Sequence, residues 1–294
     1  MTSPTAQPTT TLNNGVTMPM VGFGVFQIPD PAVCQTAVEE AIATGYRLID
    51  TAEAYQNEEA VGRAISTSIE KGIVTRDELF ITTKAFIQHI SYEGIKEAFA
   101  ASLEKLGLDY IDLYLLHQPV GDTFGAWRAM EELYKEGKVR AIGVSNFEDD
   151  QVANLSIFNE ITPAVNQIEL HVFNQKTASV DYQLSKGVQV ESWGAFAEGR
   201  FDVFRNPVLV SIAEQYGKST AQVMLRWQLQ RGIVILSKSA NPERVRANFD
   251  IFDFSLADQD MAAIAELNTD TTVFADHHEA ATVELLAGRV GKKF

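Results

Sequence analysis

The sequence predicts an α/β fold: a single (β/α)8 TIM barrel with an N-terminal β-hairpin and a C-terminal loop over the active-site face. Three observations lead to this prediction. Eight short apolar segments alternate with amphipathic helical segments, the order typical of a parallel sheet. No composition break divides the 294 residues, a length that suits one barrel of about 250 residues with extensions. No Gly-x-Gly-x-x-Gly follows a predicted strand, which disfavours the open dinucleotide-binding fold.

The N-terminal part of the chain precedes the barrel. Residues 1–10 are rich in Thr and Pro, and we expect a flexible tail there. Asn14-Gly15 lies between short apolar flanks within Leu12–Pro19, the pattern of a two-residue hairpin turn. We therefore expect a hairpin before the barrel, within one domain that spans residues 1–294.

The barrel strands are predicted from apolar runs rich in Val, Ile, Leu or Phe. The eight runs are Met20–Phe26, Arg47–Ala52, Leu79–Lys84, Ile111–His117, Val139–Ser145, Ala164–Glu169, Val188–Trp193 and Ile233–Lys238. Apolar spacings of three and four predict the helices between them. These helices are Pro31–Thr44, Asn57–Lys71, Ser91–Leu106, Phe124–Lys135, Asp149–Asn159, Gln175–Lys186 and Ser219–Gln230. A last helix near Leu256–Leu267 precedes a C-terminal segment, residues 268–294, expected to cover one end of the barrel.

Composition and charge exclude several classes of protein. The net charge of −15 disfavours a nucleic-acid partner, since phosphate binding needs a positive face. The only cysteine, Cys34, lies in a predicted helix and is expected to be a small core residue. The N-terminus has no signal-peptide pattern, and no apolar run is long enough to span a membrane. We expect a cytoplasmic monomer that acts on a small molecule.

Polar residues end the first strands of the predicted barrel, where the active sites of such barrels lie. The second strand ends at Asp50, with Tyr55 just beyond; the third ends at Lys84 and the fourth at His117. An ammonium group near a phenol lowers the phenol pKa, so Lys84, held by Asp50, would make Tyr55 a better proton donor. His117 would orient a substrate carbonyl by a hydrogen bond.

Each of these residues also has a structural interpretation. Asp50 would serve as a helix N-cap, Tyr55 as a packing residue in a loop, Lys84 as a surface side chain, and His117 as a satisfied, partly buried histidine. Their joint occurrence at successive strand ends favours a site. A metal centre is not predicted, because the five histidines form no His-x-His at a strand end and no His-Glu-x-x-His. A metal-dependent barrel hydrolase is therefore the weaker alternative.

A second polar group follows the last predicted strand. Lys238, Ser239, Arg244 and Asn248 lie at the strand end and in a short helix that Pro242 would begin. A helix N-terminus with Lys, Ser and Arg makes a local anion site, which contrasts with the acidic chain around it. The alternative is a solvated helix face. Trp193, at the seventh strand end, would stack on a flat ring or pack at the rim.

The sequence motifs resemble those of the aldo-keto reductases over nearly the whole chain. The first matching segment is Gly45-Tyr46-Arg47-Leu48-Ile49-Asp50-Thr51-Ala52, followed by Tyr55, Asn57-Glu58 and Val61-Gly62. The others are Leu108–Pro119, Gly143–Phe147, Asn166–Glu169 and Lys238–Asn248. Glu191-Ser192-Trp193-Gly194 is most similar to the bacterial branch of 2,5-diketo-D-gluconate reductases.

The resemblance implies NADPH-dependent reduction of aldehydes or ketones to alcohols, with Tyr55 as general acid beside Asp50, Lys84 and His117. It implies that Ser145, Asn146 and Gln167 hold the nicotinamide carboxamide and that Trp193 stacks on the ring. It further implies that Lys238, Ser239 and Arg244 surround the 2′-phosphate, with Asn248 near the adenine.

Departures from the family pattern concern the substrate pocket and the cofactor fit. Phe26 and Phe86 replace other aromatic residues, and with Phe274 they are expected to wall an apolar pocket. Ser237 and Ala247 replace a Pro and a Glu, which leaves the preference for NADPH over NADH open. Some relatives are non-enzymatic subunits, so a non-catalytic NADP(H)-binding regulatory barrel is the alternative function.

Overall fold

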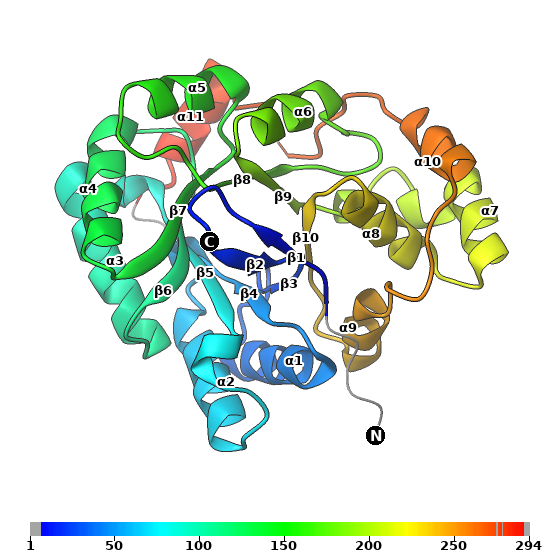
Figure 1. Cartoon of the computed structure of the whole chain (residues 1–294), viewed down its shortest axis with the longest axis horizontal. Helices are drawn as coiled ribbons and strands as arrows, with labels where there is room; N and C mark the ends of the chain where they lie inside the picture. The colour runs from blue at the N-terminus through cyan, green and yellow to red at the C-terminus, as the bar shows by residue number, and fades with distance from the viewer. Residues whose placement is uncertain (1–6, 275, 278, 291–294) are drawn as a thin grey trace.

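Eight parallel strands close into a barrel in the computed structural model, which describes residues 7–274, 276–277 and 279–290 (Figure 1). Around the barrel the order is β10-β3-β4-β5-β6-β7-β8-β9, and pairing of Ile235 with Val21 closes the ring. The strands are β3 (Val21–Gly24), β4 (Leu48–Asp50), β5 (Phe80–Ala85), β6 (Ile111–Leu116), β7 (Val139–Ser145), β8 (Val165–Glu169), β9 (Gln189–Trp193) and β10 (Val234–Ser237). Each overlaps one predicted apolar run, so the predicted barrel is confirmed.

Helices surround the barrel and connect its strands (Figure 1). From β3 to β10 they are α1 (Pro31–Thr44), α2 (Glu58–Glu70), α3 (Tyr92–Leu106), α4 (Thr123–Lys135), α5 (Asp149–Ile157), α6 (Thr177–Ser185), α7 (Pro207–Tyr216) and α8 (Thr220–Gln230). After β10 come α9 (Pro242–Phe249), α10 (Asp258–Ala265) and α11 (Ala280–Ala287). No helix in the described part of the chain is long and apolar enough to cross a membrane.

Helix α1 illustrates how the sequence sets the helix boundaries. Asp30 is its N-cap, and its carboxylate accepts hydrogen bonds from the backbone N–H groups of Ala32 and Val33, both at 2.9 Å. Pro31 occupies the first turn, and Gly45 ends the helix at φ 126°, a conformation that favours glycine. The helix buries Cys34 against the barrel, as predicted, and burial raises the pKa of this thiol to about 11.

The N-terminal hairpin closes the amino-terminal end of the barrel. Strands β1 (Thr9–Thr11) and β2 (Thr17–Pro19) pair antiparallel, and the side chains of Leu12 and Met18 pack with apolar residues of the barrel interior. The predicted tail, residues 1–10, is therefore too long, because Thr9 and Thr10 belong to β1. The Thr10 hydroxyl also bonds Gln189 of β9 at 3.1 Å, a partner that sequence spacing does not reveal.

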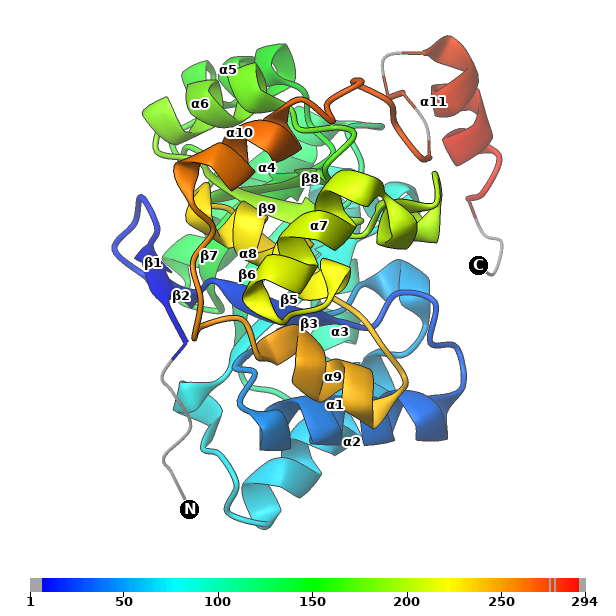
Figure 2. The same ribbon diagram turned by 90° about the vertical axis from the view of Figure 1, so that its right-hand side faces the viewer.

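The C-terminal segment reaches the opposite end of the barrel. Figure 2 shows the β1–β2 hairpin at one end of the molecule and α11 at the other. Helix α11 was not predicted, and neither was α7, which occupies the long interval between β9 and β10. Helix α7 buries Leu209, Ile212 and Ala213 at helical spacing, whereas the buried residue of α11 is Thr282.

Candidate active site

A buried ion pair joins β4 and β5 inside the carboxyl-terminal end of the barrel. Lys84 Nζ lies 2.6 Å and 2.7 Å from the two carboxylate oxygens of Asp50, and it donates a third hydrogen bond to the carbonyl of Thr51 at 2.9 Å. Lys84 is 0% exposed and Asp50 3%. The surface interpretation of Lys84 and the N-cap interpretation of Asp50 are therefore both wrong. Burial alone would lower the pKa of Lys84, but Asp50 outweighs it and raises that pKa.

Tyr55 and His117 lie together beside this ion pair. Tyr55 ends a short 3-10 helix, Glu53–Tyr55, that directly follows β4, and His117 follows β6. Lys84 Nζ lies 5.1 Å from the centre of the Tyr55 ring, whose centre lies 5.6 Å from that of His117. The structure thus brings together the four residues predicted to carry the chemistry.

Burial governs the proton affinities of both rings. It raises the pKa of Tyr55 to about 12, although Lys84 acts in the opposite direction as predicted. The expected net lowering is therefore wrong, because desolvation exceeds the effect of the ammonium group. Burial, and next the charge of Lys84, hold the pKa of His117 well below its usual value, so its imidazole is neutral at pH 7.

A cavity of about 600 Å³ opens above these residues. Its walls are largely aromatic, and all three residues predicted for the substrate pocket line it: Phe26, Phe86 and Phe274. The Phe26 ring lies 5.0 Å from the Tyr55 ring, and Phe86 stands edge-on to His117 at 5.7 Å. Helix α11 adds Leu285 and Leu286 to the same cavity. A volume of this size and an apolar lining fit a small organic molecule.

Strand ends β7 to β9 form the next part of the cavity wall, with Ser145, Asn146, Gln167 and Trp193. Asn146 adopts φ 64°, and its amide donates to the carbonyl of His117 at 3.0 Å. The indole of Trp193 donates to Asn146 Oδ1 at 2.9 Å, which fixes the plane of the ring. Gln167 Nε2 reaches across the barrel to Asp50 at 2.9 Å and to Glu191 at 2.7 Å.

The basic residues near α9 lie at the far side of the cavity. Lys238 and Arg244 line it, and with Ser239 they also line an adjoining cavity of about 310 Å³ beside residues 27–30. Asn241 caps α9 by accepting a hydrogen bond from the Arg244 backbone N–H at 3.1 Å. Asn248 lies one helical turn after Arg244 on α9, where it is buried and lines neither cavity.

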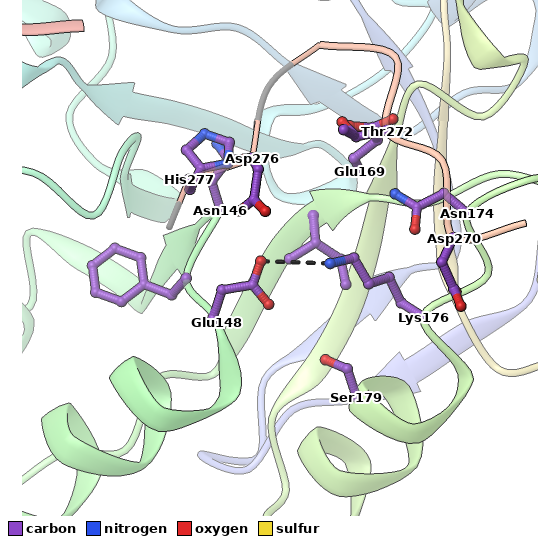
Figure 3. A pocket seen from close by; sticks show the side chains of 12 residues that line it. Asn146, Glu148, Glu169, Asn174, Lys176, Ser179, Asp270, Thr272, Asp276 and His277 are labelled. Atoms are coloured by element: carbon purple, nitrogen blue, oxygen red, sulfur yellow. Dashed lines mark hydrogen bonds and ion pairs between the residues drawn. The ribbon is translucent and has the colours of Figure 1, made fainter. Parts of the chain in front are cut away.

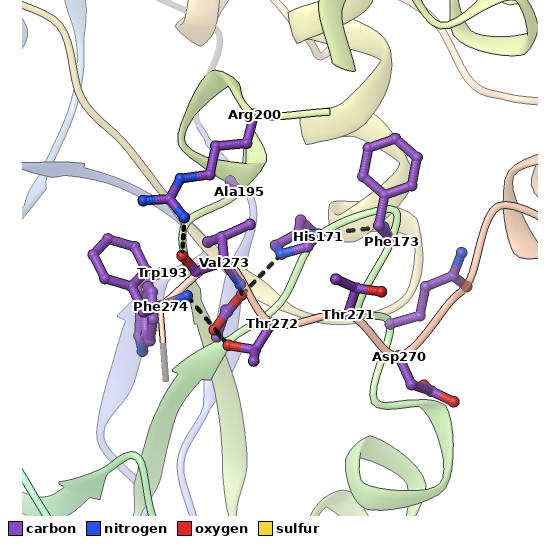
Figure 4. Close-up of polar contacts among 12 residues, drawn as sticks. His171, Phe173, Trp193, Ala195, Arg200, Asp270, Thr271, Thr272, Val273 and Phe274 are labelled. Carbon is purple, nitrogen blue, oxygen red and sulfur yellow. Dashed lines mark hydrogen bonds and ion pairs between the residues drawn. The ribbon is translucent and has the colours of Figure 1, made fainter. Parts of the chain in front are cut away.

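A set of contacts, called the clasp here, holds the C-terminal segment over the cavity (Figure 4). It consists of Glu169, His171, Arg200, Thr272 and Val273. The buried carboxylate of Glu169, at the end of β8, accepts hydrogen bonds from Thr272 Oγ1 at 2.5 Å and the Val273 backbone N–H at 2.7 Å. His171 Nε2 lies 3.0 Å from the same carboxylate. Arg200, in the loop after β9, donates to the Val273 carbonyl at 2.6 Å. These contacts place the adjacent Phe274 ring edge-on to Trp193, at 5.1 Å between ring centres.

A smaller cavity, of about 160 Å³, lies next to the clasp (Figure 3). Asn146, Glu169, Thr272 and His277 line it, and Lys176 approaches Glu148 at 3.5 Å on its other side. Asp50, Tyr55, Lys84 and His117 do not line this cavity. Its charges of both signs give it no clear ligand. His278, which follows His277 in the sequence, lies outside the described residues.

The contacts of Glu169, Glu191, Arg200 and α11 were not predicted from the sequence. Glu169 and Glu191 lie within the matching sequence motifs but had no predicted role, and Arg200 was not among the predicted site residues. The available sequence signal for Glu169 and Glu191 is the alternation of side chains along a strand, which turns each glutamate toward the barrel interior. The contacts of Arg200 and of α11 depend on how distant loops fold, which no local pattern encodes.

Comparisons with known proteins agree with this geometry. Residues 21–269 match the model of the Aldo/keto reductase family. The chain is 47% identical over 266 residues to a glyoxal reductase of Bacillus subtilis, which covers 90% of this chain and 94% of the relative. It is 43% identical over 289 residues to a morphine 6-dehydrogenase of Pseudomonas putida, with 94% and 96% covered. A solved Bombyx mori aldo-keto reductase in complex with NADP superimposes with a TM-score of 0.88, at 36% identity, covering 92% of this chain and 96% of that one.

Proposed function

Because the chain belongs to the aldo/keto reductase family, we propose that it reduces the carbonyl group of an aldehyde or ketone to an alcohol, with NADPH as reductant. The observation that carries the proposal is the buried Asp50–Lys84 pair beside Tyr55 and His117, at the base of an aromatic cavity. A purely structural barrel would gain nothing from a buried ion pair placed there, because burying two charges is costly.

The residues around the cavity fit a nicotinamide cofactor. Gln167 turns its NH2 group toward two carboxyl groups, which leaves its carbonyl oxygen to accept a hydrogen bond from a carboxamide. Trp193 offers a ring fixed by Asn146. Lys238, Ser239 and Arg244 provide donors for a phosphate at the far side, which supports NADPH over NADH. When bound, the cofactor supplies a hydride to the carbonyl carbon.

The protein's own part is to position the carbonyl and to move one proton. The neutral imidazole of His117 donates a hydrogen bond to the carbonyl oxygen without giving up its proton. The raised pKa of Tyr55 keeps its hydroxyl protonated until negative charge develops on that oxygen, and the phenol then protonates it. Lys84, kept charged by Asp50, stabilises the phenolate that remains.

Replacement of the proposed acid tests this assignment. We expect Tyr55→Phe to lower kcat by about a hundredfold or more, the usual contribution of acid catalysis. NADPH binding, measured by fluorescence titration, should change by less than about twofold, since the hydroxyl is not among the proposed cofactor contacts. Retained turnover would contradict the role of Tyr55. Binding of NADPH by the wild type without turnover on any of a panel of carbonyls would favour the regulatory barrel.

The substrate branch, the oligomeric state and the cellular location of the protein are further predictions. The motif Glu191-Ser192-Trp193-Gly194 supports the 2,5-diketo-D-gluconate reductase branch. Inclusion of that sugar acid in the carbonyl panel, with NADPH and NADH side by side, tests both substrate and cofactor preference. The expected monomer is tested by size-exclusion chromatography with light scattering, and the expected cytoplasmic location by fractionation of cells.

A further inference from the structure

A second buried carboxyl group lies behind the reacting residues, and the proposed mechanism does not use it. Glu191 stands on β9 directly beside Gln167 of β8, and it is 0% exposed. Its Oε2 accepts a hydrogen bond from Gln167 Nε2 at 2.7 Å, and the same nitrogen donates to Asp50 at 2.9 Å. One amide group thus joins two carboxyl groups inside the barrel.

The charges of this cluster do not balance if both carboxyl groups are ionised. Among the residues that the structure describes, Lys84 is the only cation in it, and its three hydrogen bonds go to Asp50 and to the Thr51 carbonyl. None reaches Glu191, whose second oxygen has no hydrogen-bond partner among the described residues. Its strand neighbours, Gln167 on β8 and Val234 on β10, are neutral. An ionised Glu191 would be a buried, unpaired charge, which is among the most costly features in a fold.

Glu169 shows the opposite arrangement on the neighbouring strand. It is also a buried glutamate at a strand end, but its carboxylate accepts hydrogen bonds from Thr272 and the Val273 backbone and contacts His171. Burial would raise the pKa of Glu169, but these three partners outweigh burial and lower it. Glu169 is 8% exposed and Glu191 0%, so the two glutamates differ in the donors around them as well as in depth.

We propose that Glu191 is a positioning residue that carries a proton at neutral pH, orients the Gln167 amide, and holds the reacting cluster at zero net charge. The inference rests on the proposed function and adds a residue to it. The neutral acid still accepts from Gln167 Nε2, so the amide oxygen stays turned toward the cavity. Asp50 then remains the only ionised carboxyl group and pairs with Lys84.

The proton on Glu191 also affects Tyr55. Burial, and next the charge of Asp50, raise the pKa of Glu191 to about 8. Loss of its proton above this value adds a negative charge to the cluster, and that charge raises the pKa of Tyr55 further. A weaker acid donates its proton more slowly, so carbonyl reduction should decline as the pH rises through the pKa of Glu191.

The pH profile of an isosteric variant tests this effect. Wild-type kcat should decline as the pH rises through the pKa of about 8 and level off at the slower rate of the form in which Glu191 is ionised. Glu191→Gln is always neutral and still accepts from Gln167, so its own kcat should stay constant between pH about 7 and about 9, without that alkaline decline. A simply structural residue would change kcat at all pH values equally. An unchanged alkaline decline in Glu191→Gln would overturn the proposal.

Infrared spectroscopy of the protein without cofactor gives a readout independent of activity. The wild-type spectrum should contain the carbonyl stretch of one buried carboxylic acid at pH about 6.5 and lose it at pH about 9.5. Glu191→Gln should lack this band at both values, whereas the matched control Glu169→Gln should keep it. Absence of the band from the wild type at the lower pH would overturn the proposal even if carbonyl reduction is confirmed. The wild-type comparison decides the question if a variant does not fold.

Discussion

At the scale of single residues, burial decides the protonation of Tyr55 and His117 more than the neighbouring charge of Lys84 does. Tyr55 keeps its proton although Lys84 lies 5.1 Å from its ring, and His117 stays neutral beside the same ammonium group. Both effects favour an arrangement in which one group donates a proton and the other only a hydrogen bond.

The lowered pKa of His117 makes stability depend on pH. The unfolded chain binds a proton at this residue below pH about 6.5, whereas the native protein does not, so acid favours unfolding. Stability attributable to His117 is present above pH about 6.5 and falls by about 1.4 kcal/mol per unit below it. Urea unfolding at pH about 7.5 and about 5 should therefore show a smaller loss for His117→Asn than for the wild type, by about 2 kcal/mol.

His89 provides a control for this measurement. Its ring nitrogen lies 2.8 Å from the Glu53 carboxylate, and its side chain is 32% exposed, whereas burial lowers the pKa of His117. His89→Asn should not reduce the loss of stability in acid. An equal effect of both substitutions would show that the pH dependence arises elsewhere.

Residue identities at the strand ends were predictable, but their energetics were not. Asp50, Lys84 and His117 end apolar runs, and a parallel barrel gathers such ends at one face. The sequence could not show that Glu191 lies against Gln167 without a cation, because that depends on β8–β9 register. Nor could it show that desolvation exceeds the effect of Lys84 on Tyr55.

At the scale of elements, the clasp at Glu169 fixes one wall of the substrate cavity. Hydrogen bonds to a charged group contribute about 1.5–3 kcal/mol each. Glu169→Gln removes the charge that holds Thr272 and Val273, so the C-terminal segment should spend less time over the cavity. We expect the KM for carbonyl substrates to rise about tenfold with kcat within about threefold, because each 1.4 kcal/mol is a factor of ten.

Hydrogen exchange locates the effect of this substitution. Backbone amides near Val273 should exchange faster in Glu169→Gln, and those of the barrel strands should not. Glu266→Gln, an exposed change on the same C-terminal stretch, is the matched control and should alter neither KM nor exchange. Unchanged exchange at Val273 in Glu169→Gln would contradict the role of the clasp.

Most helices with start and stop signals in their own sequence were predicted, although α7 was not, and α11, which depends on distant contacts, was not predicted either. Helix α1 has its cap, proline and glycine within its own sequence. Helix α11 is short, and its Leu286 finds its partners near Phe86, about two hundred residues earlier in the chain. The clasp similarly joins β8, the loop after β9 and the C-terminal segment, which only the closed barrel brings together (Figure 4).

At the scale of the whole molecule, the hairpin that closes one end of the barrel is separate from the chemistry at the other (Figure 2). Met18 of β2 is fully buried against the barrel interior. Met18→Ala should lower the free energy of unfolding by about 2–5 kcal/mol, the cost of a cavity in a packed core. At temperatures where the variant is folded, kcat should match the wild type.

Denaturant unfolding and steady-state kinetics on the same preparation check this prediction. Val16→Ala, which removes a partly buried side chain of the hairpin, should cost less, because fewer of its contacts are lost. A fall in kcat of Met18→Ala in proportion to its lost stability would show that the two ends of the barrel are coupled.

The bond from Gln167 to Asp50 crosses the barrel, and it has a consequence for the order of events during synthesis. The first half of the chain contains Asp50, Lys84 and His117, but Gln167 on β8, which bonds Asp50, and Glu191 on β9 are translated much later. A nascent half-barrel would therefore hold an ion pair open to water and no cofactor platform. Arg244 lies on α9, which follows β10, so capture of the cofactor should wait until the ring has closed and α9 has formed.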